Sequence, residues 1–341
     1  MVTNEIHILY LSDVNYATFA GTSVVSLFEN NRHFDQITVW LIDDNLGEEN
    51  RRKFQEAADT YGREVRFLDM SDGIRKLQEI GAPRYRNSYT TYLKLFAFGM
   101  LPDDVHRVFF IDSDSVVTGK LDELTTFDMQ GNTVAAVMDV LCKDYMISLG
   151  FPAEDNWFNM GVMLVDIDAW KQNGCEAQII ENMKKRCAYV AVDQDLLNTT
   201  LHGKITTLPP CYNTTPHHYV YDHDDVMKCF PWDHFYSEEE IAQAQKNPVI
   251  RHFERFLGQS PWHLKSLHPF TKDFDYYLSI SPWKDYQKQK ANNTMTFRIE
   301  RLLYRILPKK LFLPIFAHFY RRYFKKTADS LIKGSINNIK V

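Results

Sequence analysis

Short apolar runs alternate with longer amphipathic segments over the first hundred residues of the chain. Three runs are short and apolar enough to be predicted as strands: Ile6–Leu11, Ile37–Ile42 and Val65–Leu68. Three segments between them have the spacing of helices: Ala17–Glu29, Glu48–Tyr61 and Tyr89–Met100. Such alternation predicts a parallel, doubly wound α/β sheet.

The next apolar run, Val108–Ile111, ends in two carboxylates, Asp112 and Asp114. Its continuous apolar character predicts a central strand that is covered on both faces. Two carboxylates at the end of such a strand repel each other unless a cation lies between them, and oxygen ligands suit Mg²⁺ or Mn²⁺. Taken alone, the pair is explained more simply as a solvated turn, because short acidic motifs are common by chance.

The second half of the chain continues with further strands and helices and one aperiodic stretch. The predicted strands are Thr133–Met138, Met160–Val165 and Pro248–Phe253, and the predicted helices are Ala191–Thr200 and Ser237–Gln245. Glu240 completes a capping box with Ser237. Residues Leu208–Trp232 are rich in Pro, His, Tyr and Asp without a sustained period, which predicts an irregular, lid-like region.

Composition places the chain among ordinary globular proteins but shows an uneven charge. Of 341 residues, 45% are hydrophobic and 24% charged, which excludes a disordered or collagen-like chain. The net charge of −5 gives no support for a nucleic-acid partner. Nine Lys/Arg and one Glu lie between Phe297 and Lys326, so this segment carries +8 and the remainder −13.

This basic segment, 297–326, also carries many Leu, Ile, Phe and Tyr residues, and Pro308 and Pro314 are predicted to break it into short helices. Such a pattern suits a peripheral contact with the interface of an anionic membrane. Helices packed on the domain with their basic face in water explain it equally well.

The remaining sequence features favour a cytoplasmic location. The five cysteines form no C-x-x-C pair, and free thiols in a reducing compartment explain them most simply. The N-terminal residues lack the pattern of a secretory signal. No run of about 18 apolar residues is present that would form a spanning helix. We therefore expect a cytoplasmic protein, in contact with the inner face of the membrane if the basic segment binds lipid.

Six motifs together resemble glycosyltransferase family eight, which includes retaining bacterial enzymes of lipopolysaccharide synthesis and the glycogenins. They occur in the family's order between about residues 5 and 265: Ser12-Asp-Val-Asn-Tyr16, Thr91-Tyr-Leu-Lys94, Phe110-Ile-Asp-Ser-Asp-Ser115, Phe158-Asn-Met-Gly161, Asp193-Gln-Asp195, and His252 with Pro261-Trp262. The resemblance implies a GT-A fold with a mixed, doubly wound sheet in residues 1–275 and a basic helical extension in 276–341. It also implies a UDP-sugar donor and a divalent metal, typically Mn²⁺.

The resemblance assigns roles to individual residues. Asp112, Asp114 and His252 would bind the metal. The donor would contact Ser12, Asp13, Asn15, Tyr16, Lys94, Asp112, Ser113, Asp114, Asp139, Asn159, Asp193, Gln194, His252 and Gly258. The residues implied for catalysis are Gln194, Asp195 and Asp139. On local grounds, Asp13 could instead cap a strand-to-helix turn and Lys94 could be a solvated helix residue.

Two positions depart from the family pattern. Lys94 replaces an arginine that touches the donor in many relatives, which keeps the charge but loses the bidentate geometry. Ser260 replaces a lysine that reaches the diphosphate, in a loop two residues longer than usual. Either Arg255 supplies the missing charge from this longer loop, or the diphosphate site is weaker than in relatives; we predict that Arg255→Ala raises the KM for the donor.

These observations lead to a predicted activity and two alternatives. The predicted activity is a retaining transfer of glucose or galactose from a UDP-sugar to a saccharide, which we expect to be lipid-linked or a cell-surface glycan precursor. An amide is a poor nucleophile, so Gln194 is expected to steady the oxocarbenium charge during front-face attack. The alternatives are an inactive UDP-sugar-binding scaffold and a metal-dependent nucleotidyltransferase, although no Gly-rich phosphate loop favours the latter.

Overall fold

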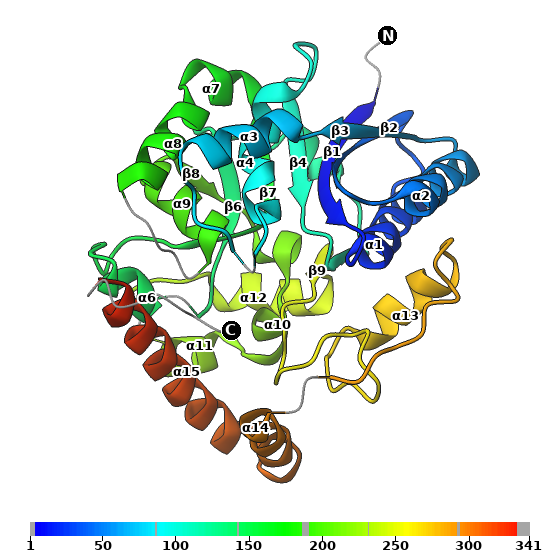
Figure 1. Ribbon diagram of the computed structural model, residues 1–341. Helices are drawn as coiled ribbons and strands as arrows, with labels where there is room; N and C mark the ends of the chain where they lie inside the picture. The colour runs from blue at the N-terminus through cyan, green and yellow to red at the C-terminus, as the bar shows by residue number, and fades with distance from the viewer. Residues whose placement is uncertain are drawn as a thin grey trace.

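The computed structural model describes residues 4–85, 87–141, 143–185, 191–230, 232–291 and 294–332. At its centre lies a seven-stranded sheet flanked by helices (Figure 1). In chain order its strands are β1 (Glu5–Asp13), β2 (Gln36–Asp44), β3 (Glu64–Asp69), β4 (Arg107–Ile111), β6 (Val134–Met138), β7 (Phe158–Asp166) and β8 (Ile205–Thr207). Consecutive residues of β4 and β7 are buried, so both faces of the sheet are covered, as the apolar run before Asp112 predicts.

The sheet is mixed, with the order β3-β2-β1-β4-β7-β6-β8. Strands β1 to β4 are parallel, whereas β7 is antiparallel to both β4 and β6. The mixed, doubly wound architecture that the resemblance implies is therefore confirmed, and the wholly parallel sheet expected from alternation alone is wrong at β7. An apolar run predicts that a strand is buried, but not whether it runs parallel or antiparallel to its neighbours. The direction of β7 depends on how the chain returns from β6.

Among the described residues, eleven helices lie outside the 208–232 stretch and the C-terminal segment. They are α1 (Ala17–Asn30), α2 (Glu48–Tyr61), α3 (Ser71–Glu79), α4 (Thr90–Met100), α5 (Asp122–Thr125), α6 (Lys143–Ser148), α7 (Ile167–Gln172), α8 (Cys175–Lys185), α9 (Val192–Thr200), α12 (Glu238–Lys246) and α13 (Thr271–Ser279). Helices α1, α2, α4, α9 and α12 confirm the predicted ones, including the capping box of Ser237 and Glu240.

A second, two-stranded sheet joins distant parts of the chain beside the first. It pairs β5 (Ser115–Val117) with β9 (Ile250–His252), and Ser115 lies opposite His252. The predicted strand Pro248–Phe253 is therefore confirmed as β9. This register places His252, at the end of β9, beside the loop that follows β4.

The stretch 208–232 is helical rather than irregular, so that prediction is wrong. It contains the 3₁₀ helix η1 (Pro210–Asn213) and the short helices α10 (Pro216–Val220) and α11 (His223–Cys229). These short helices lack a hydrophobic period, and side-chain caps stabilise their first turns instead. Thr215 accepts from the His218 N–H, and Asp222 forms a capping box with Asp225.

The C-terminal segment forms two helices, α14 (Met295–Ile306) and α15 (Lys309–Ile332), at the periphery of the molecule (Figure 1). Pro308 separates them as predicted, but α15 runs through Pro314. Pro314 and Lys310 are both exposed, so water can reach the Lys310 carbonyl that loses its helical donor. None of the helices among the described residues is both long and apolar enough to cross a bilayer.

The domain boundary predicted at residue 275 stays a proposal. The residues on its two sides are in close contact. Helix α13 runs across it, and Trp283 packs against Phe54 with ring centroids 4.8 Å apart. A Cβ on Gly21 would lie 2.1 Å from the Trp283 ring, so glycine is needed where the chain crosses α1. Cys175, Cys211 and Cys229 are free thiols as expected, and the other two cysteines lie outside the described residues.

Candidate functional site

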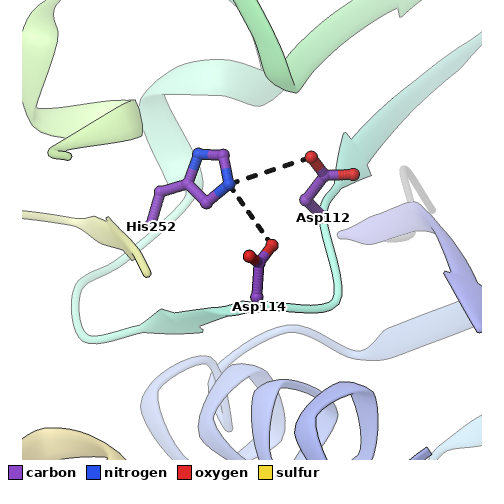
Figure 2. Close-up of side chains that lie close together, drawn as sticks. All are labelled: Asp112, Asp114 and His252. Carbon is purple, nitrogen blue, oxygen red and sulfur yellow. Dashed lines mark ion pairs between the residues drawn. The ribbon is translucent and has the colours of Figure 1, made fainter. Parts of the chain in front are cut away.

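Asp112, Asp114 and His252 converge at the end of β4 (Figure 2). His252 Nε2 lies 3.8 Å from Asp112 Oδ2 and 3.3 Å from Asp114 Oδ1. One ligand atom from each residue lies within 4.8 Å of the other two. These separations are short enough for one cation to contact all three side chains.

Backbone pairing puts the three residues together. The Asp112 N–H donates to the Gly161 carbonyl (2.7 Å), which continues the β4–β7 ladder by one residue. Asp114 lies just before β5, and its carbonyl accepts from the Phe253 N–H at 2.6 Å. The β5–β9 register then faces His252 toward the carboxylates, so the site follows from strand pairing rather than from loop folding.

Two residues that the sequence analysis did not single out as ligands shape this cluster. A Cβ on Gly161 would lie 2.2 Å from His252 Cε1 and 2.9 Å from Asp112 Oδ2, so only glycine leaves room for both side chains. Asn213 Oδ1 lies 3.1 Å from His252 Nδ1, while its Nδ2 donates to Asn159 at 2.8 Å. Asn213 thus accepts from Nδ1–H, which directs the other imidazole nitrogen at the carboxylates.

The charges of the cluster favour a cation at its centre. Burial disfavours the charged form of His252, but the hydrogen bond and charge of Asp114 raise its pKa to about 9. Burial raises the pKa of Asp112 to about 6, against the opposing charges of Lys94 and His252. In the absence of a metal, a proton on His252 therefore offsets the negative charge of the neighbouring carboxylates. Two carboxylates and one imidazole, with space left by Gly161, fit Mn²⁺ well and Mg²⁺ acceptably.

Lys94 is a member of this charged network and not a solvated helix residue. Its side chain is 2% exposed. The ammonium donates to the Met160 carbonyl at 3.0 Å, pairs with Asp193 and lies 3.9 Å from Asp112 Oδ1. Burial opposes its charge, but Asp112 and Asp193 keep its pKa above the ordinary value. Lys94 therefore brings α4, β4 and α9 together around a fixed positive charge.

Asn159 links the Asp112–Asp114–His252 cluster to the other residues implied for the donor sugar. Its Nδ2 donates to Glu254 Oε1 (2.5 Å) and lies 3.5 Å from Asp139 Oδ2. Gln194 Nε2 donates to the same Asp139 oxygen at 3.2 Å, and Gln194 Oε1 accepts from the Met160 N–H at 3.4 Å. The structure therefore brings Asp139, Asn159 and Gln194 together beside Lys94 and the cluster.

Glu254 is a further acidic residue of this region that the sequence analysis missed. Burial disfavours its carboxylate, but the contact with His217 and the charge of His252 lower its pKa to about 2. Glu254 Oε2 lies 3.6 Å from His217 Nδ1. Glu254 and His217 line a small recess together with Asp139, Val140, Leu141, Asn159, Thr215 and His218. The position of Glu254 two residues after His252, just beyond the end of β9, was the available signal.

Two predicted site residues are held in the core. Asp195 is fully buried, and its carboxylate accepts from the Tyr145 hydroxyl and, at 3.2 Å, from the Ala191 N–H. It therefore supports the first turn of α9, which carries Gln194. Ser113 is 7% exposed and donates to the Leu11 carbonyl, so its hydroxyl ties the loop after β4 to β1.

The predicted nucleoside residues form the turn between β1 and α1. The Asp13 carboxylate accepts from the backbone N–H groups of Asn15 and Tyr16, both at 2.9 Å, and from Asn15 Nδ2 at 3.1 Å. Asp13 therefore caps this strand-to-helix turn, which is the alternative role expected from its local sequence. Ser12 is buried, whereas Tyr16 remains 40% exposed and packs edge-on against Phe19.

The loop after His252 connects the cluster with the C-terminal helices. Gly258 has φ +71°, and a Cβ there would lie 2.4 Å from the Phe297 ring of α14. Ser260 is buried and its N–H donates to His263 Nδ1 at 2.8 Å. Arg255 is exposed on this loop. Its assigned role toward the diphosphate stays a prediction.

Comparison with known proteins was made at the level of both sequence and structure. The family described as Glycosyl transferase family 8 matches residues 7–265. General stress protein A of Bacillus subtilis is 24% identical over 281 residues, covering 81% of this chain and 94% of that protein. Lipopolysaccharide 1,2-glucosyltransferase of Escherichia coli is 26% identical over 302 residues, covering 86% and 83%.

Among solved structures, the galactosyltransferase LgtC in complex with donor and acceptor sugar analogues superimposes with a TM-score of 0.65. The superposition covers 81% of this chain and 96% of that protein at 21% identity. This similarity shows the fold, which is of the GT-A type.

Proposed function

The chain belongs to glycosyl transferase family 8 and is a glycosyltransferase, and we propose that it transfers glucose or galactose from a UDP-sugar to a saccharide acceptor with retention of configuration. The observation that supports this proposal is the convergence of Asp112, Asp114 and His252 beside the buried Lys94 and Gln194. A nucleoside diphosphate leaving group concentrates negative charge, and this end of the sheet gathers the groups that would bind it.

Asp112, Asp114 and His252 would hold Mn²⁺ or Mg²⁺. The bound cation would supply Lewis-acid stabilisation of the diphosphate oxygens as they take up charge. Lys94 is placed to add a second positive charge on the same side, and Asn213 keeps the His252 ring oriented. Ser12, Asp13, Asn15 and Tyr16 would contact the nucleoside, with the exposed Tyr16 ring available for stacking on a base.

The donor sugar would lie beside Asp139, Asn159, Asp193 and Gln194, whose polar atoms can bind its hydroxyl groups. We assign Gln194 to charge stabilisation, because an amide is a poor nucleophile. Its Oε1 accepts from the Met160 N–H at 3.4 Å, which places the side chain beside the end of β7. In this proposal the amide oxygen stabilises the developing oxocarbenium ion. Front-face attack follows, with the acceptor proton passing to the departing phosphate oxygen.

We propose a saccharide acceptor on a lipid carrier or cell-surface precursor, met at the cytoplasmic face of the membrane. A relative of similar length is a lipopolysaccharide glucosyltransferase, which supports this class of acceptor. The basic C-terminal segment gives independent support, because it would attract anionic lipid.

UDP release from UDP-glucose, UDP-galactose and their N-acetyl forms, measured with and without Mn²⁺, tests the activity. We expect turnover with one of the two hexoses that requires the metal and increases with the correct acceptor. Thermal protection by the UDP-sugar without any release of UDP would instead identify an inactive binding scaffold. A sugar adduct trapped on Gln194 or Asp195 would contradict front-face transfer while leaving the activity itself intact.

A further inference from the structure

The loop after β9 makes a tight turn whose backbone conformation does not suit its sequence. The Phe256 N–H donates to the Gln259 carbonyl at 2.8 Å, and the Gln259 N–H donates to the Phe256 carbonyl at 2.9 Å. Between them, Leu257 and Gly258 have φ +52° and +71°, which is the pattern of a type I′ turn. Asn-Gly is the usual pair in this turn, and leucine is uncommon at its first central position. Contacts from outside the turn are therefore needed to hold it.

Helix α14 supplies those contacts. Arg301 Nη1 donates to the Leu257 carbonyl at 2.9 Å. The Phe297 ring lies 2.4 Å from the place that a Cβ on the turn glycine would take, so it covers the second central residue. Tyr304 packs edge-on against Phe256 with ring centroids 5.3 Å apart. Three side chains at intervals of four and three residues therefore hold the turn from one face of α14.

Helix α14 is fixed in turn to the body of the protein through α15. The rings of Tyr304 and Phe312 lie 5.1 Å apart, and Phe312 is 2% exposed on the inner face of α15. Further along α15, Arg321 pairs with Asp144 of α6 and donates to the Cys229 carbonyl at 3.2 Å. The segment therefore packs on the domain, as one of its two explanations expected, and gives the turn a fixed support.

The two ends of the loop reach two parts of the proposed donor site. Before the turn, the Phe253 N–H donates to the Asp114 carbonyl at 2.6 Å. After it, the Trp262 ring stacks on Phe19 at 3.9 Å, and Phe19 contacts the Tyr16 ring edge-on at 5.5 Å. The loop thus extends from the end of β4 to the turn proposed to contact the nucleoside. The diphosphate of a nucleotide sugar lies between its nucleoside and its sugar, so the conformation of this loop bears on its binding.

We propose that α14 positions the loop 253–262 for the diphosphate of the donor, with Arg301 as the positioning residue. This inference rests on the proposed function, which makes a UDP-sugar the donor. The loop is two residues longer than the family pattern, and α14 restricts the conformational freedom that the added length brings. Arg301 contacts the backbone of the loop, so its loss should weaken donor binding without changing the chemical step.

Donor kinetics of Arg301→Ala, measured as Mn²⁺-dependent UDP release, test the proposal. We expect the KM for the UDP-sugar to rise about tenfold and kcat to change by less than about twofold, because ground state and transition state lose the same binding contribution. Arg301→Lys can still donate to the Leu257 carbonyl and should recover most of the loss. Arg305→Ala is the matched control, because Arg305 is exposed on the same helix and should behave like the parent.

Hydrogen exchange of the protein without donor gives a readout that does not depend on activity. The Phe256 and Gln259 amides should exchange about tenfold faster in Arg301→Ala and in Phe297→Ala, and at the parent rate in Arg301→Lys. Circular dichroism verifies that each variant is folded. Exchange at the parent rate in both alanine variants, or a fall in kcat with an unchanged KM, would overturn the proposal.

The two readouts separate this inference from the proposed function. A parent protein that neither binds nor turns over a UDP-sugar would contradict the proposed function, while faster exchange in Arg301→Ala would still support the hold of α14 on the loop. A parent that turns over the donor, with an Arg301→Ala variant equal to it in KM and in exchange, would contradict the positioning role alone.

Discussion

The Asp112–Asp114–His252 cluster and the apolar stripe, a row of exposed side chains on α14 and α15, violate the usual distribution of polar and apolar groups in opposite directions. The stripe consists of Met295, Ile299, Leu302 and Ile306 on α14 and Leu311, Ile315, Phe319 and Tyr323 on α15. Lys94 and His252 are charged yet at most 5% exposed, whereas Met295 and Phe319 are apolar yet 70% and 65% exposed. Burying charge is costly unless it is paired, and contiguous apolar surface is uncommon on a soluble monomer. Each region therefore has an uncommon arrangement that suits a ligand, which would be a cation with a diphosphate in one case and a bilayer in the other.

The two regions differ in how they are held without a ligand. The cluster is internally compensated, because Lys94 pairs with Asp193 and His252 faces the carboxylates of Asp112 and Asp114. The stripe has no such compensation and depends on the buried opposite face of α15 for its position. We therefore expect changes in the cluster to affect turnover strongly, and changes in the stripe to affect membrane binding alone.

Asp114→Ala is the most severe test of this difference. Loss of one carboxylate should lower Mn²⁺-dependent UDP release about 1000-fold or more, because the charge that develops on the diphosphate is no longer neutralised. Repulsion between two carboxylates alone would make this variant more stable than the parent. His252 and Lys94 offset that repulsion, so we expect a melting temperature near that of the parent without metal. Mn²⁺-dependent turnover within tenfold of the parent would remove Asp114 from the site.

Acid should destabilise the region between the cluster and α15 through His218. Burial lowers the pKa of His218 from 6.5 to about 4, and its ring lies 3.1 Å from the Met138 carbonyl and 3.0 Å from Thr215 Oγ1. Its contribution is complete above pH 6.5 and is lost as the pH falls toward 4, because the unfolded chain takes up the proton first. The loss amounts to about 3 kcal/mol at most.

Urea unfolding at a series of pH values measures this loss. His218→Gln can keep a donor for the Met138 carbonyl and does not titrate, so its stability should fall less steeply below pH 6.5. Parallel loss of stability in parent and variant would assign the acid sensitivity to other groups.

Gly161→Ala tests whether the cluster requires a residue without a Cβ at position 161. The added carbon would lie 2.2 Å from His252 Cε1, so the imidazole must move away from the carboxylates. We expect the Mn²⁺ concentration for half-maximal activity to rise about 100-fold. Gly99→Ala is the matched control, because its Cβ would meet only the end of the Glu176 side chain, at 3.2 Å. Equal Mn²⁺ dependence in both variants would refute this role.

Asn213→Ala should have a smaller effect, because Asn213 acts through His252. Loss of the Nδ1 partner frees the ring to rotate, and we expect about tenfold weaker activation by Mn²⁺. Asn213→Asp retains the acceptor and should recover part of this loss. Metal activation that is unchanged in Asn213→Ala would show that strand pairing alone orients His252.

These residues also show which parts of the site were accessible from sequence. The strand before Asp112 could be predicted because burial of a continuous apolar run is a local property. His252 required the family resemblance, since its approach depends on the register between β5 and β9, whose paired residues are 133 or more positions apart in the sequence, as at Val117↔Ile250.

Asn213 was missed because η1 and α10 have no hydrophobic period, although Thr215-Pro216 and Asp222-x-x-Asp225 were readable helix starts. The direction of β7 and the continuity of α15 through Pro314 depend on tertiary packing, which local sequence patterns do not reveal. The apolar stripe was visible in composition, but only the structure separates its open face from its buried one.

Arg255→Ala gives the smallest expected effect and tests the loop that joins the two regions. Arg255 is exposed between His252, which faces the carboxylates, and Gly258, which contacts Phe297 of α14. If its guanidinium replaces the lysine that Ser260 lacks, the variant should raise the KM for the UDP-sugar about threefold and leave kcat unchanged, since the contact is solvent-exposed. Arg255→Lys should restore the parent value, because a point charge suffices for a phosphate. Unchanged donor kinetics in Arg255→Ala would show that the diphosphate depends on Lys94 and the metal ligands, and that this loop serves mainly to anchor α14.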